Sequence, residues 1–410
     1  MREEWKLVAL NQLCEFFDRR GITPKKLGGD FHDTGYRVIS AKNIKQRSVD
    51  LNFGEQRYVD KPTYEKWMNT SLLPDDVLLT SEAPLGEPAY ITEELQWCLG
   101  QRLFGIRTNK EMLLGKFLFY GFQAPQIRVD LLSRATGATA QGIRKAELIK
   151  VSTPLPPLPE QERIVSILDK AFEGIDKAIA QTKQNLASAR ELFESYLNNI
   201  FTQKGEDWVE KKLGDVCKFS SGGTPSKKTT AYWSGKIPWV SGKDMKRDRI
   251  KDAILHISES AIADNKARIA KIGSLLILVR GMGLANGVAI AELTAPCSFN
   301  QDIKAIDPDP EVYSRFLLFS LKSSFSDSAK ILSSAAHGTL KIEMDRLKVT
   351  PVSLPDYPQQ KAIVTQLDAL SDSIKQLEAL YTQKLNDLKE LKQSLLQQAF
   401  AGELTKEDAA

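Results

Sequence analysis

Two long stretches of the chain carry apolar side chains at alternating spacings of three and four residues. The first runs from Pro154 to Phe201 and the second from Leu354 to Phe400. This spacing is typical of a coiled-coil seam rather than of the wider apolar face of a helix in a globular domain. Roughly 40 residues at about 1.5 Å each predict helices about 60 Å long. A helix of that length needs a partner, so the pattern predicts that the two stretches pair.

Each predicted helix follows a proline-rich segment, because proline can precede a helix but cannot continue one. Glu160 then favours the positive first turn of the first helix. The phase of the second seam slips once, after Tyr381. The predicted seam consists of Ile164, Leu168, Ile175, Leu186 and Phe193 in the first helix, and of Ile363, Leu367, Leu370, Ile374, Leu377, Leu388 and Leu395 in the second.

The two helices begin alike, which indicates an internal duplication. Pro159 aligns with Pro358, and Asp169 aligns with Asp368 at the same offset of 199 residues. A period this long is too long for a solenoid and indicates a domain and its helix, present twice.

We predict one mixed α+β domain in the segment before each helix, because these segments contain several short β-branched runs and only a few helical stretches. Tyr36–Lys45 matches Ile237–Lys246, and Leu73–Ser81 matches a second apolar run that begins at Lys271. The predicted fold class is therefore α+β, with two tandem mixed α/β domains and two long helices that pair. The expected boundaries are 1–153 and 206–353 for the domains, and 154–205 and 354–410 for the helices with the C-terminal tail.

Composition limits the class of protein further. The formal net charge of +4 is mildly basic and compatible with nucleic acid. The four cysteines form no CxxC pair, so we expect free thiols in a reducing cytoplasm. The longest apolar run, Leu275–Val279, is too short to span a membrane, so we expect a cytoplasmic protein without a membrane partner.

Motifs for catalysis are missing from the sequence. The glycine-rich run at Gly222 lacks Walker A spacing, and Gly281–Gly287 departs by one residue from the dinucleotide-binding pattern. The three histidines have no metal-ligand spacing. Asp75 and Asp76 could form a nuclease carboxylate pair, but an acidic turn before a strand is the better interpretation. We therefore predict no catalytic residues and no metal site.

The ordered motifs of both halves resemble the specificity subunit of type I restriction–modification systems. They include a Trp-to-Cys segment at Trp208–Cys217, an SGGTP loop at Ser221–Pro225, an IPWVSG run from Ile237, and an LP-EQ-LD pattern that opens the helix at Pro159. The first copy departs from this pattern, with Arg20–Pro24 in place of SGGTP. The resemblance implies a target recognition domain in each half. It also implies that the helices pair antiparallel, as a spacer and as a docking surface for modification subunits.

DNA readers need cations for phosphates and amide or guanidinium groups for base edges. Three pairs of loops at matching places carry such side chains. A basic loop is more often just a solvated surface, but recurrence in both repeats favours nucleic acid for the loops. The candidate DNA-binding residues are Lys42, Asn43, Lys45, Gln46, Arg47, Gln101, Arg102, Thr139 and Gln141 in the first half, and Lys243, Lys246, Arg247, Arg249, Asn300, Gln301, His337, Thr339 and Lys341 in the second.

The expected partners are double-stranded DNA, two methyltransferase subunits and, in a complete complex, restriction subunits. The resemblance places S-adenosylmethionine, ATP and magnesium on those partner subunits, so we expect this chain to bind no cofactor. The helix length predicts a bipartite, asymmetric target with a fixed unread gap. Two alternatives stay open: a coiled-coil adaptor that binds proteins, and an enzyme whose site the motifs do not reveal.

Overall fold

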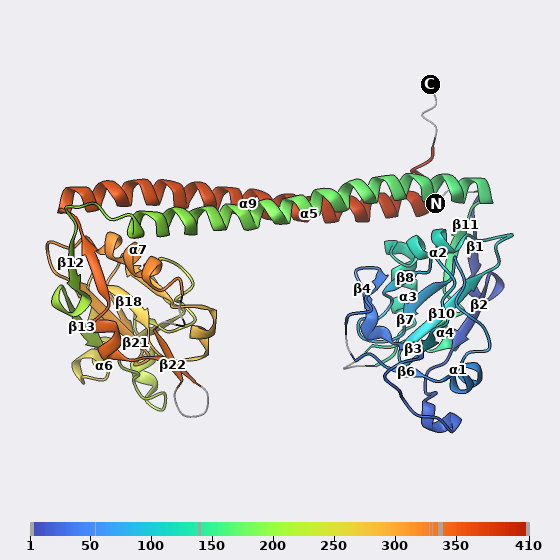
Figure 1. Cartoon of the computed structure of the whole chain (residues 1–410), viewed down its shortest axis with the longest axis horizontal. Helices are drawn as coiled ribbons and strands as arrows, with labels where there is room; N and C mark the ends of the chain where they lie inside the picture. The colour runs from blue at the N-terminus through green and yellow to red at the C-terminus, as the bar shows by residue number, and fades with distance from the viewer. Residues whose placement is uncertain are drawn as a thin grey trace. The chain divides into compact units, whose positions relative to one another are not determined.

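The computed structural model describes residues 4–53, 55–137, 141–327, 329, 331–334 and 339–406, and it divides into two compact units. Unit 1 comprises Met1–Lys183 with Thr382–Ala410, and unit 2 comprises Gln184–Tyr381. Each unit contains one globular domain and a segment of both long helices, α5 (Leu158–Thr202) and α9 (Tyr357–Ala401), which Figure 1 labels. The predicted fold class is confirmed, since two mixed α/β domains alternate with two long helices.

Unit 1 is built on two sheets and a closing strand pair. The larger sheet has the antiparallel order β2–β10–β7–β8, and the smaller has the order β6–β3–β9, in which β3 and β9 are parallel. Strands β1 and β11 pair just before the chain enters α5. The bounds are β1 Lys6–Ala9, β2 Cys14–Asp18, β3 Tyr36–Ile39, β4 Ile44–Lys45, β5 Ser48–Val49, β6 Tyr58–Val59, α1 Lys61–Trp67, β7 Val77–Thr80, β8 Pro88–Tyr90, β9 Cys98–Leu99, β10 Leu103–Thr108, α2 Gly115–Gly121, α3 Pro125–Ser133, α4 Lys145–Leu148 and β11 Ser152–Leu155.

Unit 2 repeats this plan. Its sheets have the orders β13–β21–β18–β19–β15 and β16–β14–β20–β17, and β12 pairs with β24. The short edge strands β15 and β17 extend the sheets beyond those of unit 1. The bounds are β12 Val209–Lys212, β13 Cys217–Ser221, β14 Ile237–Val240, β15 Arg249–Ile250, β16 Leu255–Ile257, α6 Glu259–Ala263, β17 Ile269–Ala270, β18 Leu275–Leu278, β19 Ile290–Leu293, β20 Cys297–Phe299, β21 Ile303–Pro308, α7 Ser314–Ser324, β22 Leu332–Ser334, β23 Leu340–Ile342, α8 Met344–Lys348 and β24 Pro351–Leu354.

In each unit the core joins the larger sheet to the long helices. Phe104 of β10, Phe117 of α2 and Leu168 of α5 are fully buried in one core of unit 1. Phe316 of α7 and Leu367 of α9 are fully buried in the corresponding core of unit 2. Each fully buried leucine or phenylalanine contributes about 1.5–3 kcal/mol, so the helices are part of the domains rather than separate from them.

The buried face of α5 runs along its whole length. Ile164 and Leu168 are fully buried, Ile175 is nearly so, and Leu186 and Phe193 are half-buried. The apolar residues at the start of the helix pack into the core of unit 1, so they bind the domain as well as the other helix.

The buried face of α9 agrees in part with the predicted seam, since Leu367 and Ile374 are buried as predicted. Val364, Ser371 and Ile374 are buried, whereas Leu377 is 39 % exposed, so the prediction that Leu377 lies in the seam was wrong. The face also includes polar side chains such as Ser371, so an apolar pattern alone cannot mark all of its positions. The remaining predicted positions, Ile363, Leu370, Leu388 and Leu395, are half-buried.

The two helices run antiparallel within unit 1. The Thr405 hydroxyl, just beyond α9, donates to Glu160 near the start of α5, and the Lys392 ammonium pairs with Asp176 further along. Residue numbers therefore rise on one helix as they fall on the other. In unit 2 the same two helices are joined by Arg190, whose Nε lies 2.6 Å from a carboxylate oxygen of Glu378.

Within the described residues, no helix combines the length and apolar character needed to cross a membrane.

Candidate nucleic-acid interface

Strand ends bring two of the candidate loops of unit 1 together. The parallel strands β3 and β9 both end at this edge, and Gly100 N–H donates to the Ile39 carbonyl at 2.7 Å. The Ala41 N–H in turn donates to the Gln101 carbonyl at 3.3 Å. The loop after β3 therefore lies directly beside the turn at Gln101 and Arg102.

The third candidate loop joins the same edge through Ser81, the residue after β7. The Ser81 N–H donates to the Arg102 carbonyl, and the Ser81 carbonyl accepts from the Ile143 N–H, each at 2.9 Å. Ile143 follows Gln141 by two residues, so the described part of this loop lies beside the Arg102 turn.

Unit 2 uses equivalent backbone bonds. The Asn300 N–H donates to the Val240 carbonyl at 3.0 Å, which joins the loop after β14 to the turn after β20. The Val279 N–H donates to the Asp302 carbonyl at 2.8 Å and its carbonyl accepts from Ile342 at 2.9 Å. Both units therefore assemble three separate loops at one end of their sheets.

Most candidate side chains of unit 1 are exposed at this edge. They are Lys42, Lys45, Gln46, Gln101, Arg102 and Gln141. Gln46 and Arg47 have φ angles of 49° and 68° and form the tight turn between β4 and β5. The Lys45 ammonium lies 4.0 Å from the centre of the Phe53 ring. Thr139 lies outside the described residues.

Two candidates of unit 1 are already engaged by the protein. Asn43 is buried: its Oδ1 accepts from the Ser40 N–H at 2.9 Å, and its Nδ2 donates to the carbonyls of Asp50 and Phe53. Arg47 turns towards α5, where its guanidinium carbon lies 5.9 Å from the centre of the Phe172 ring. These contacts give Asn43 and Arg47 structural roles in the loop.

Unit 2 exposes Lys243, Lys246, Arg247 and Gln301. Arg249 instead reaches α9, where its Nη2 lies 3.0 Å from an Asp368 oxygen. Lys341 pairs with Glu343 at 2.5 Å, while Thr339 is half-buried. Asn300 is half-buried, and among the described residues its Oδ1 has no hydrogen-bond partner. His337 lies outside the described residues.

The glycines of the SGGTP loop let that loop cross the Asn300 turn. A Cβ on Gly222 would lie 2.2 Å from the Asn300 carbonyl oxygen, and one on Gly223 would lie 2.4 Å from the Lys266 oxygen. With that space open, the Thr224 hydroxyl reaches the Gln301 side chain and donates to it. The loop therefore belongs to the candidate interface of unit 2.

Sequence reasoning missed three charged residues at these edges: Arg20, Glu82 and Arg280. The Arg20 guanidinium stacks 4.1 Å from the centre of the Phe104 ring and donates to the Ile143 carbonyl at 3.2 Å. Arg20 opens the loop that matches SGGTP, and Glu82 and Arg280 each stand two residues beyond an apolar strand. These positions in the sequence could have indicated that the three residues lie at the loop clusters.

A repeated glutamine fixes each globular domain to its long helix. In unit 1, Gln161 is fully buried, and its Oε1 accepts from the Leu114 N–H at 2.9 Å. Its Nε2 donates to the carbonyls of Met112 and Pro156, each at 2.8 Å. The amide therefore ties the start of α5 to the segment before α2.

Gln360 makes the equivalent three bonds in unit 2. Its Oε1 accepts from the Tyr313 N–H at 2.8 Å, and its Nε2 donates to the carbonyls of Glu311 and Pro355 at 3.1 and 3.0 Å. The glutamine of the LP-EQ-LD pattern is therefore a structural cross-link.

The aspartate of the same pattern makes a second cross-link. Asp169 accepts from Lys116 Nζ at 2.7 Å and from the Tyr120 hydroxyl at 2.6 Å. Burial and this contact both raise the pKa of Tyr120. In unit 2, Asp368 holds the buried Arg315 at 2.8 Å as well as Arg249.

Some of the carboxylate and thiol groups that could suggest catalysis are buried, among them Asp76 and Cys98. Asp76 is buried and paired with Arg107 at 2.7 Å, so the Asp75–Asp76 turn is structural. Across the described residues, no group of three or more His, Cys, Asp or Glu side chains could hold a metal ion. Burial raises the pKa of the Cys98 thiol to about 12, far from the range of a nucleophilic cysteine.

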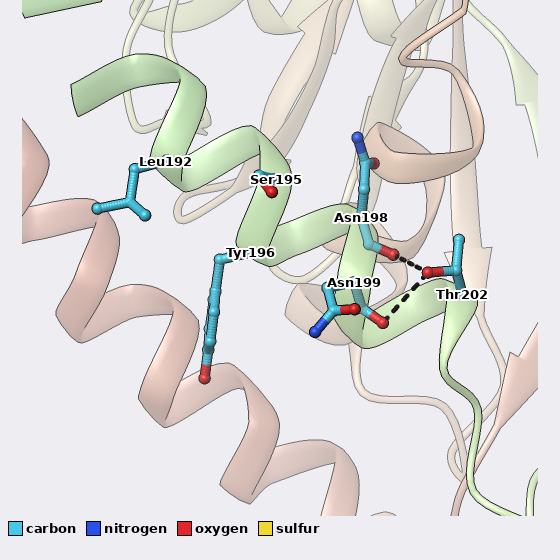
Figure 2. A pocket seen from close by; sticks show the side chains of 6 residues that line it. All are labelled: Leu192, Ser195, Tyr196, Asn198, Asn199 and Thr202. Atoms are coloured by element: carbon cyan, nitrogen blue, oxygen red, sulfur yellow. Dashed lines mark hydrogen bonds between the residues drawn. The ribbon is translucent and has the colours of Figure 1, made fainter. Parts of the chain in front are cut away.

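The long helices of unit 2 expose apolar side chains to solvent. Leu192 is 58 % and Tyr196 38 % exposed on α5, and Leu380 is 61 % exposed on α9. Leu192 and Tyr196 line a shallow groove that continues to Thr202. Figure 2 shows both projecting to one side of α5, with the Asn198–Thr202 turn further along.

Known proteins share the sequence pattern and the architecture of this chain. A family model described as the type I restriction modification DNA specificity domain matches residues 2–187 and again 205–389. The chain is 28 % identical over 225 residues to the specificity subunit of the EcoR124I/EcoR124II type I restriction enzyme of Escherichia coli, covering 53 % of this chain and 55 % of the relative. It is 30 % identical over 173 residues to the MjaIX specificity subunit of Methanocaldococcus jannaschii, covering 41 % and 39 %. The matched stretches thus span about half or less of these relatives.

The fold is similar over its whole length to a solved chain from work on complex assembly and conformational transition of the type I R-M system. That chain is 19 % identical, has a TM-score of 0.78, and the match covers 98 % of this chain and 99 % of the other. Each of the two segments matched by the family model contains its own loop cluster of those described above.

Proposed function

Since this chain belongs to the type I restriction–modification DNA specificity family, we propose that it recognises a bipartite, asymmetric DNA sequence, with each unit reading one half. The role is recognition, and methylation and cleavage would belong to partner subunits. A complex of this kind acts on DNA in the cytoplasm.

The observation that carries the proposal is the repeated loop cluster. In each unit, three loops that are distant in sequence meet at one end of the sheets through equivalent backbone bonds. The scaffold is the same in both units, whereas the exposed side chains differ. Two copies of one scaffold with different side chains suit two different half-sites.

The exposed side chains suit the two tasks of a DNA reader. Lys42 and Lys45 in unit 1, and Lys243, Lys246 and Arg247 in unit 2, would contact phosphates and position each unit. Gln101 and Gln301 at the turns carry amides, which can bond base edges in the major groove. Asn43, Arg47 and Arg249 stay out of this set because the protein already engages them.

The long helices supply the spacing in this proposal. Each is continuous over 45 residues, or about 68 Å, and contributes to both units. The length of the two helices would then set the unread gap between the half-sites.

The helices also supply the docking surface. Leu192 and Tyr196 on α5 and Leu380 on α9 are exposed, and aromatic side chains such as Tyr196 are enriched at protein interfaces. We assign this surface of unit 2 to one methyltransferase subunit and expect a second such subunit on the helices of unit 1, while restriction subunits would join the complete complex. S-adenosylmethionine, ATP and magnesium would bind those partners rather than this chain.

Selection of bound duplexes from a random DNA pool tests the proposal, with the full chain co-purified with its methyltransferase partner. We expect a two-part consensus with a constant gap. A pool that stays unenriched at low salt would reject DNA recognition and favour the protein-adaptor alternative, because phosphate contacts strengthen as salt falls.

A further inference from the structure

The two units carry oppositely placed charges at one equivalent pair of positions. In unit 1, Glu82 stands two residues beyond β7 and Arg102 stands just before β10. In unit 2 the same places hold Arg280 and Asp302. The equivalence rests on backbone bonds, since Ser81 N–H donates to the Arg102 carbonyl as Val279 N–H donates to the Asp302 carbonyl.

In unit 1 these side chains form an exposed ion pair at the centre of the loop cluster. Arg102 Nε lies 3.0 Å from Glu82 Oε2, and the two side chains are 57 % and 40 % exposed. Among the described residues, the terminal nitrogens of Arg102 have no partner. The guanidinium can therefore keep its Glu82 contact and still donate two hydrogen bonds outward.

The surrounding backbone is arranged for this pair. Arg102 has a φ of 62°, which lies in the left-handed region that few residues other than glycine and asparagine adopt. A Cβ on Gly142 would lie 2.9 Å from Glu82 Cγ, so the glycine leaves room for the glutamate. An exposed ion pair adds little to stability, so fold stability alone does not account for the arrangement.

Opposite charges side by side match one base pair in the major groove. Guanine presents two acceptors, O6 and N7, which arginine can bind with two hydrogen bonds, and cytosine presents an amino group to a carboxylate. Resting on the function proposed above, we propose that Glu82 with Arg102, and Arg280 with Asp302, each read one G·C pair. Because the charges are exchanged, the two units read that pair in opposite orientations relative to their own sheets.

The test uses the random-pool selection on the full chain with its methyltransferase partner. Glu82→Gln and Arg102→Gln should each relax one G·C position in the half-site of unit 1, with discrimination lost by roughly 5-fold or more. The exchange Glu82→Arg with Arg102→Glu should turn that position from G·C to C·G. The other half-site should be unchanged in all three and serves as the internal reference.

Two further variants make the outcome decisive. Lys61→Glu with Glu65→Lys exchanges the charges of an exposed pair on α1 and should alter neither half-site. Arg280→Gln should relax one G·C position in the half-site of unit 2 only, which provides an independent test if unit 1 variants fold poorly. Variants with wild-type melting curves and an unchanged consensus would overturn this inference alone, whereas a wild-type pool without consensus would overturn the proposed function as well.

Discussion

At the residue scale, one side-chain amide connects each domain to its helix. Gln161 and Gln360 each satisfy two carbonyls and one N–H in places closed to water. An amide is suited to this position because it offers a donor and an acceptor without a charge to desolvate. The chain uses the same residue at both copies because the backbone geometry to be satisfied is the same.

Replacing Gln360 with leucine should lower the free energy of unfolding of unit 2 by about 2–4 kcal/mol, because three buried backbone groups lose their partner. Chemical denaturation measures the change. Gln376→Leu, at an exposed position of the same helix, should change stability by at most about 0.5 kcal/mol. Equal effects of the two substitutions would contradict the cross-link.

Residue-scale prediction from the sequence was limited by side-chain direction. Asn43 and Arg47 stand in a polar loop and satisfy every compositional test for DNA contact, yet one is buried and the other faces α5. Composition locates a loop but not the way its side chains point. Glu82 and Arg102 show the converse, since a pair 20 residues apart in sequence becomes adjacent only when β7 pairs with β10.

At the element scale, the helix pair contains a buried cation. Lys392 is 5 % exposed, lies 4.7 Å from the centre of the Phe172 ring and pairs with Asp176, whose side chain is 61 % exposed. Burial lowers the pKa of Lys392. The Lys392 ammonium is therefore removed from water while the Asp176 carboxylate stays solvated, so burial costs free energy for Lys392 but not for Asp176.

This inequality predicts opposite effects of two substitutions. Lys392→Met should leave the stability of unit 1 unchanged or raise it by about 1 kcal/mol, because the buried charge is removed and Asp176 stays solvated. Asp176→Asn should lower the stability by about 1–3 kcal/mol, because the buried ammonium loses its counter-ion. Denaturant titration of both variants checks the prediction, and a larger loss for Lys392→Met would contradict it.

The same residue explains why the seam of α9 was only partly predictable. Ser371, Glu378 and Lys392 occupy the inner face, where an apolar pattern finds nothing to follow. The pattern located the helix and its length but assigned Leu377 to the wrong face. Polar seam positions become visible only when their partners on the other helix are known.

At the scale of the whole molecule, the duplication was the most predictable feature. Two copies of an ordered set of motifs predicted two mixed domains and two helices, and the sheets of the units share one strand order apart from short edge strands. The sequence could not predict that each unit takes a segment of both helices, because that depends on contacts between residues about 200 positions apart.

Helix length should control the gap in the DNA target. Inserting seven residues into both helices at the unit boundaries, after Lys183 and after Tyr381, preserves the seam and adds about 10 Å. The gap should grow by about two or three base pairs while both half-sites stay the same. Random-pool selection measures both features.

The matched control inserts the same seven residues into α5 alone, which shifts one helix against the other. That variant should not give a lengthened gap with intact half-sites. If the double insertion changed the half-sites and left the gap fixed, the helices would not set the spacing.

The core of unit 1 is completed by the end of α9, and this has a consequence for biosynthesis. Leu396 and Phe400 are buried in its core, with the Phe400 ring centre 4.6 Å from that of Phe117. Chains emerge from the ribosome from the N-terminus onward. Unit 2 is continuous from Gln184 to Tyr381, so it does not need the later part of α9, which belongs to unit 1, in order to fold. The domain that is translated first would therefore finish folding last, with part of its apolar core uncovered until the end of α9 has emerged.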